Sequence, residues 1–180
     1  DGTKMYVVGS SSDNVNEYDL STAWDISTAS YLQNFNVSSE EPTAQGLFFK
    51  PDGTKMYIVG SAGDEVNEYD LSTAWDVTTA SYLQNFSVSG QDTSPIDISF
   101  ISDGKKMYVL GATQEYVNEY TLSTAWDVST ASYVRRFPVT SQDATPQGLF
   151  VRPAGEGFYM AGATSDRVYQ YSMGQLDVST

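Results

Sequence analysis

The chain has 180 residues, no cysteine, no histidine and a formal net charge of -14, with 9 Lys and Arg against 23 Asp and Glu. Without cysteine or histidine, disulfides, thiolate chemistry, Cys or His metal centres and imidazole-dependent catalysis are excluded. The acidic balance would repel a phosphate backbone, so we expect no nucleic-acid partner. No apolar run approaches the roughly 18 residues of a membrane span, and none is expected.

The first predicted elements are a turn and two strands. Residues 1–4, Asp-Gly-Thr-Lys, are a turn signal, because glycine adopts a positive φ at little steric cost. Aromatic and β-branched residues then predict a strand over 4–9. A second strand is predicted over 15–20, where polar and apolar residues alternate with a period of two.

Two further strands complete the first unit. Residues 21–30 are too polar for a strand and too short for an isolated helix, so we expect a structured loop held by Trp24. A strand is predicted over 31–37, and the almost wholly apolar run 45–50 predicts another that is buried on both faces. Four strands joined by short polar turns indicate a meander sheet.

The unit recurs with a step of 51 residues, which separates Tyr6, Tyr57, Tyr108 and Tyr159. A period near fifty is typical of propellers. We therefore predict an all-β β-propeller of four-stranded blades in one domain, 1–180, with repeats 1–51, 52–102, 103–153 and a partial 154–180. Grouped into blades that each start with an inner strand, the predicted strands give three in the first blade, four in each of the middle two and three in the last, about three and a half blades in all.

Residues 51–60, Pro-Asp-Gly-Thr-Lys-Met-Tyr-Ile-Val-Gly, and 66–71, Val-Asn-Glu-Tyr-Asp-Leu, resemble the Asp-Gly hairpin repeats of YVTN- and NHL-type β-propellers. The fuller pattern over 71–82 is similar to uncharacterised repeat proteins of phage and marine bacterial sequences. This resemblance covers essentially the whole chain and favours an extracellular or virion-associated protein. It implies that strands like 45–50 line a central channel and strands like 31–37 lie outermost. It supplies no catalytic motif.

That arrangement would gather carboxylates on one rim and at the channel mouth. The candidate ligand-binding residues are Asp13, Glu40, Glu41, Asp64, Asp92, Asp97, Asp143 and Asp166. Ca²⁺ could use such oxygens. However, no Asp-x-Asp-x-Asp spacing occurs, and turn Asp and Asn usually bond their own backbone. We therefore expect no metal and no cofactor, with Ca²⁺ as the alternative.

The repeated Trp-Asp pairs have two interpretations. An exposed tryptophan beside a carboxylate could stack against a sugar ring, whereas a structural tryptophan would be buried between neighbouring blades. We favour the structural interpretation, and expect the tyrosines of the second strands to serve the same end. The predicted structural anchors are Trp24, Trp75, Trp126, Tyr18, Tyr69 and Tyr120.

The function predicted from this pattern is non-catalytic, multivalent binding or scaffolding, with a carbohydrate or protein ligand and no catalytic residue. The alternative is a carbohydrate-active hydrolase that uses Asp97, Glu40 and Asp92, since glycoside hydrolysis needs two carboxylates across a cleft. An open propeller would expose two apolar blade faces. We therefore expect a homodimer that closes a ring of seven or eight blades, or else a longer propeller that closes within one chain.

Overall fold

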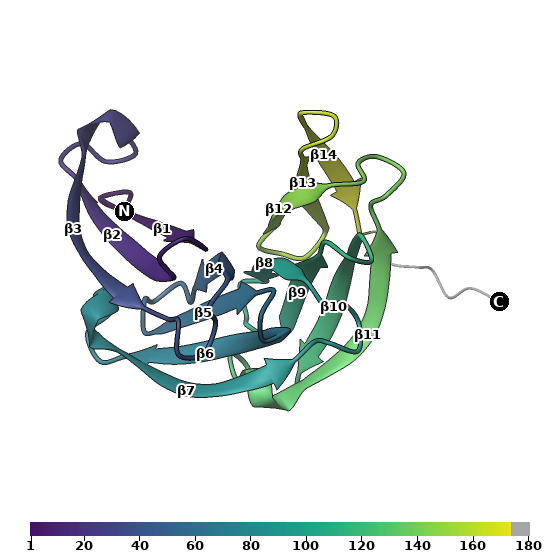
Figure 1. Ribbon diagram of the computed structural model, residues 1–180, viewed down its shortest axis with the longest axis horizontal. Coiled ribbons are helices and arrows are strands. Elements are labelled where there is room, and N and C mark those ends of the chain that lie inside the picture. The colour runs from purple at the N-terminus through teal and green to yellow at the C-terminus, as the bar shows by residue number, and fades with distance from the viewer. Residues whose placement is uncertain (174–180) are drawn as a thin grey trace.

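The computed structural model describes residues 1–173, and they form four antiparallel sheets arranged side by side in an arc (Figure 1). The all-β prediction is confirmed. Sheet 1 contains β1 (Lys4–Gly9), β2 (Asn14–Leu20) and β3 (Ala29–Asn36). Sheet 2 contains β4 (Ala44–Phe49), β5 (Lys55–Gly60), β6 (Glu65–Leu71) and β7 (Ala80–Ser87). The predicted strand bounds agree with these to within two residues.

The pattern repeats in the second half of the chain. Sheet 3 contains β8 (Pro95–Phe100), β9 (Lys106–Gly111), β10 (Tyr116–Leu122) and β11 (Ala131–Pro138). Sheet 4 contains β12 (Pro146–Val151), β13 (Gly157–Gly162) and β14 (Arg167–Ser172). Strands β4, β8 and β12 lie on the inner side of the arc, and β3, β7 and β11 lie on its outer side (Figure 1).

Three 3-10 helices precede the outer strands: η1 (Ile26–Thr28), η2 (Val77–Thr79) and η3 (Val128–Thr130). The sequence predicted a structured loop at these places, without a helix. Each helix is preceded by an N-cap aspartate whose side chain accepts a hydrogen bond from the backbone N–H two residues later, as Asp76 does from Thr78 at 3.0 Å. This is the usual capping role of aspartate. None of the helices among residues 1–173 is long and apolar enough to cross a membrane.

The tryptophan loops are fastened to the Asp-Gly hairpins. Gly53 has a φ of 73° and Trp75 a φ of 69°, a conformation that a bulky residue rarely adopts. The Trp75 N–H donates to the Gly53 carbonyl at 3.0 Å, and a Cβ added to Gly53 would lie 2.4 Å from the indole. The same pairs form between Trp24 and Gly2 and between Trp126 and Gly104. Glycine at the hairpin therefore lets the indole lie flat on the turn.

The core lies between the sheets, because each sheet packs its apolar face against the next. One cluster joins sheets 1 and 2 through residues such as Val15 and Met56. A second joins sheets 2 and 3 through Tyr57 and Val109, and a third joins sheets 3 and 4. Face-to-face packing of sheets about 10 Å apart excludes water from both inner surfaces.

Equivalent residues at the two ends of the arc are exposed. Ile26 of sheet 1 is 74% exposed, whereas its counterparts Val77 and Val128 are fully buried. At the other end Val168 is 70% exposed, whereas Val66 is fully buried. The same side chains are thus buried wherever a neighbouring sheet covers them.

Candidate functional site

A buried carboxylate joins sheets 1 and 2 and another joins sheets 2 and 3, a feature that the sequence analysis missed. Glu68 of β6 has a side chain with no solvent exposure, and Lys55 Nζ lies 2.5 Å from its Oε1. Its Oε2 accepts hydrogen bonds from Gln84 Nε2 at 2.9 Å and from the Val128 N–H of the next sheet at 3.0 Å.

Glu17 makes the equivalent contacts with Lys4, Gln33 and Val77. The recurrence of lysine 13 residues before each glutamate was the signal that could have revealed them.

Three of the predicted ligand-binding carboxylates are buried supports for neighbouring loops. Glu41 is fully buried and accepts hydrogen bonds from the N–H groups of Thr43, Ala62 and Gly63. Asp92 and Asp143 occupy the equivalent positions in the next two repeats and accept from the corresponding N–H groups. Hydrogen bonds from Ser165 and Thr145 hold the pKa of Asp143 well below its ordinary value. Each of these side chains links the loop that precedes an inner strand, such as β4, to the turn that follows the next strand of the same sheet, such as β5.

The other rim carboxylates reach solvent. Asp13, Asp64 and Asp166 each have a φ near 50° at the same turn position, where aspartate is one of the few residues that accept a left-handed backbone. Oδ1 of Asp13 and of Asp64 is buried without a hydrogen-bond partner among the described residues. Glu40 is half-buried and accepts from the Tyr69 hydroxyl at 3.2 Å. Residues 1–173 contain no group of three or more acidic residues arranged to hold a metal ion.

Asp97 lies apart from the rim, on the inner strand β8. Its Oδ1 accepts the Ile98 N–H at 2.8 Å, and its Oδ2 accepts the Leu149 N–H of sheet 4 at 2.6 Å. Burial raises the pKa of Asp97 to about 6, and the two hydrogen bonds act in the opposite direction. The structure therefore does not bring Asp97 together with Glu40 and Asp92, which contact other partners.

Stability should depend on pH through Asp97. Its folded pKa of about 6 exceeds the ordinary 3.8, so the folded protein binds this proton more tightly than the unfolded chain does. The resulting stabilisation is complete below about pH 4 and is lost as the pH rises through 6, amounting to about 2–3 kcal/mol. We expect the unfolding free energy of the wild type, minus that of Asp97→Asn, to fall by this amount between pH 4 and pH 7.5 in urea titrations. A difference that stays constant or rises would contradict this assignment.

Burial of the predicted anchors increases along the chain. Trp24 is 81% exposed, Trp75 is 36% exposed and Trp126 is half-buried among Phe48, Tyr57 and Phe100. Trp24 therefore differs from the expected burial between sheets, because the described residues place no sheet on that side of it. Tyr69 and Tyr120 are fully buried, whereas Tyr18 is half-buried for the same reason.

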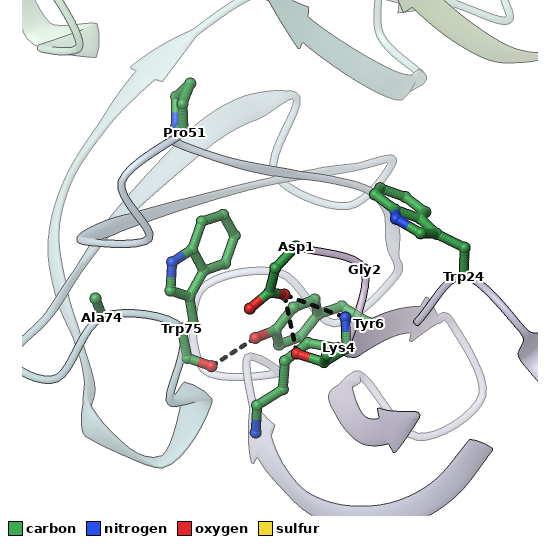
Figure 2. A pocket seen from close by; sticks show the side chains of 9 residues that line it. Asp1, Gly2, Lys4, Tyr6, Trp24, Pro51, Ala74 and Trp75 are labelled. Carbon is green, nitrogen blue, oxygen red and sulfur yellow. Dashed lines mark hydrogen bonds between the residues drawn. The ribbon is translucent and has the colours of Figure 1, made fainter. Parts of the chain in front are cut away.

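The structure contains a cavity of about 600 Å³ beside β1. Figure 2 shows Trp24 and Trp75 on two sides of it, with Tyr6 and Asp1 between them. The Tyr6 hydroxyl donates to the Trp75 carbonyl at 2.6 Å. The lining residues are Asp1, Gly2, Thr3, Lys4, Tyr6, Trp24, Pro51, Ala74 and Trp75. Its lining combines aromatic faces with charged and polar groups.

No model of a protein family matches the sequence, and no curated protein matches it. Solved structures similar to this chain include a Bacteroides fragilis protein named as a 6-phosphogluconolactonase, with a TM-score of 0.66 and 15% identity over 97% of this chain and 48% of that one. The periplasmic gluconolactonase PpgL of Pseudomonas aeruginosa gives a TM-score of 0.60 and 16% identity, covering 97% of this chain and 48% of that one. A chain of the nidogen/laminin complex gives a TM-score of 0.62 and 11% identity, covering 94% of this chain and 57% of that one.

These likenesses support a propeller-like fold. The chain spans about half the length of the structures it matches. At such low identities they carry no site residues across to this chain.

Proposed function

We propose that this chain is a propeller-like, non-catalytic binding or scaffold module in which each sheet is a blade and each 51-residue repeat presents the same surface. Carbohydrate is the ligand class that best suits this surface. The observation that carries the proposal is an exposed apolar pair on the outer strand of three successive sheets. The pairs are Tyr31 and Leu32, Tyr82 and Leu83, and Tyr133 and Val134.

These pairs favour binding for a physical reason. Each outer tyrosine packs edge-to-face on the tyrosine of the neighbouring strand, as Tyr82 does on Tyr69 with ring centroids 5.7 Å apart, and still presents much of its surface to solvent. Exposed aromatic residues are enriched where proteins meet ligands and partners, and a tyrosine ring face suits a sugar ring. Identical sites on one rigid body raise avidity by about 10²–10⁴ over a single site when a ligand can reach several of them.

A second candidate function is a hydrolase. Two of the similar structures are named as gluconolactonases, and the raised pKa of Asp97 is of the kind found in catalytic carboxyl groups. Against this, both carboxylate oxygens of Asp97 are held by backbone N–H groups of its own and the neighbouring strand. A carboxylate so engaged has little freedom to act on a substrate.

A glycan array and a panel of glycoside and lactone substrates on the same sample test the two functions. We expect binding to dense immobilised glycans and no turnover. Tyr31→Ser, Tyr82→Ser and Tyr133→Ser combined should weaken array binding at least about tenfold, and each single change should weaken it less. Asp97→Asn is the control and should bind as the wild type does. Turnover that Asp97→Asn abolishes would establish the hydrolase instead, and the absence of both activities would rule out carbohydrate binding.

A further inference from the structure

The inner edge of β1 differs from the inner edges of its counterparts. Strands β5, β9 and β13 are each paired on both sides, with β4, β8 and β12 as their inner partners. Within the described residues β1 pairs with β2 alone. Accordingly, every residue of β5 from Met56 to Gly60 is buried, whereas no residue of β1 is. A strand edge of this kind offers unpaired N–H and C=O groups to another strand.

The cavity of Figure 2 lies between residues of sheets 1 and 2. At the corresponding place between sheets 2 and 3, the structure has an aromatic residue of an inner strand. There the Phe48 ring of β4 stacks on Trp126, with ring centroids 6.3 Å apart and planes 17° apart. Trp75 occupies the equivalent position one sheet earlier and contacts Tyr6 and Phe49. Trp75 lines the cavity, and its ring contacts among residues 1–173 include no counterpart of the Phe48 contact with Trp126. A phenylalanine of an inner strand at this place would supply that contact.

The far end of the β1 edge is open as well. A Cβ built on Gly60 would lie 2.3 Å from the Thr43 carbonyl and 2.6 Å from the Glu41 carboxyl, and Gly111 and Gly162 meet Asp92 and Asp143 in the same way. At Gly9 no atom lies within 4 Å of that position.

The turn after β1 also has donors to offer. The N–H groups of Ala62 and Gly63 donate to Glu41. Those of Ser11 and Ser12, one repeat earlier, have no acceptor among residues 1–173. The β1 edge thus ends in two N–H groups that are placed as the carboxylate-binding pair is in the other repeats.

We propose that the β1 edge, the cavity beside Trp75 and the Ser11–Ser12 turn form one docking groove for an extended peptide strand of the β4 type. The ligand is a segment with a carboxylate, then a small residue three positions on, then glycine, leucine and two phenylalanines, as in residues 41–49. Its carboxylate accepts the two turn N–H groups, and its first phenylalanine fills the cavity. Binding of this kind adds a strand to an exposed sheet edge.

The register follows from sheet 2. There Ala44 pairs with Gly60, Leu47 with Ile58 and Phe48 with Tyr57. Carried to sheet 1, the small residue lies opposite Gly9, the leucine opposite Val7 and the first phenylalanine opposite Tyr6. This groove uses none of the outer tyrosines, so the inference stands or falls separately from the proposed function.

A synthetic peptide of residues 41–50, Glu-Pro-Thr-Ala-Gln-Gly-Leu-Phe-Phe-Lys, tests the groove against the whole chain. We expect saturable binding by calorimetry and slowed amide hydrogen exchange along β1. A Phe48→Ser peptide should bind at least about tenfold more weakly, because it leaves the aromatic cavity unfilled. A Glu41→Gln peptide should bind several-fold more weakly, because it loses the charge-assisted hydrogen bonds.

The protein variant Gly9→Val places a side chain where the peptide backbone must pass. Because Gly9 has open space and no positive φ, the variant should fold with unchanged stability and lose peptide binding at least about tenfold. Gly90→Val, at another open glycine outside the groove, is the matched control and should bind as the wild type does. No saturable binding at millimolar peptide, or wild-type affinity in Gly9→Val, would overturn the proposal. Array binding of glycans should be the same in both variants.

Discussion

Glu68→Ala should lower the free energy of unfolding by about 2–4 kcal/mol, since it removes a fully buried acceptor that joins two sheets. The Val128 N–H and the Gln84 amide lose Oε2 as their acceptor, and Lys55 loses its buried ion-pair partner at Oε1. Lys55 retains Asp70 at 2.6 Å, which limits the cost. Urea denaturation followed by circular dichroism measures the change.

Asp70→Asn is the matched control for Glu68→Ala. It removes an ion pair with the same lysine, but the Asp70 side chain is 52% exposed. Exposed pairs contribute about 0–1 kcal/mol, so this variant should remain close to the wild type. If Glu68→Ala destabilised the protein no more than Asp70→Asn does, the clamp between sheets would not be a significant source of stability.

Trp126→Ala should destabilise the protein by about 2–4 kcal/mol, whereas Trp24→Ala should cost less than about 1 kcal/mol. The Trp126 ring packs between sheets 2 and 3, with the Phe100 centroid at 5.3 Å and the Phe48 centroid at 6.3 Å. Trp24 lies on its hairpin with most of its surface in water. Removing it leaves no comparable void, so little packing energy is lost.

The two tryptophans form a close comparison because their backbones match. Their φ values are 67° and 66°, so any cost of placing alanine in the left-handed region is nearly the same in both variants. The difference between them reports packing alone. The loss in free energy of unfolding for Trp75→Ala should lie between those for Trp24→Ala and Trp126→Ala. Equal losses at all three positions would show that contacts with the hairpin outweigh contacts between sheets.

The strands and their order could be predicted because their signals are local. Alternation with a period of two places side chains on the two faces of a strand, and Asp-Gly with a following apolar run marks a hairpin wherever it occurs. The 3-10 helices were missed because three residues carry too little pattern to separate a helix from a loop. Their Asp-x-Ser and Asp-x-Thr caps at Asp25, Asp76 and Asp127 were nevertheless present in the sequence.

The candidate site was predicted less completely, because the same residue type serves different purposes at different depths. Sequence spacing placed Glu41 and Asp166 on one rim, but Glu41 is buried against the backbone of its neighbouring turn and Asp166 is exposed. Glu68 received no role from the sequence, although it is the buried link between two sheets. Whether a carboxylate is exposed depends on which residues pack over it in the tertiary structure, and those residues are distant in the sequence.

The sequence by itself determined an all-β repeat array, because hairpin chemistry and strand alternation act over a few residues and recur at a fixed step. The tertiary structure alone decided which copy of each repeated residue is core and which is surface. Trp24 and Trp126 lie in nearly identical local sequences, yet one is exposed and the other packs between sheets. Among the described residues, burial is set by the neighbouring sheet and not by the residues of the repeat itself, because a side chain loses contact with water only where another sheet packs over it.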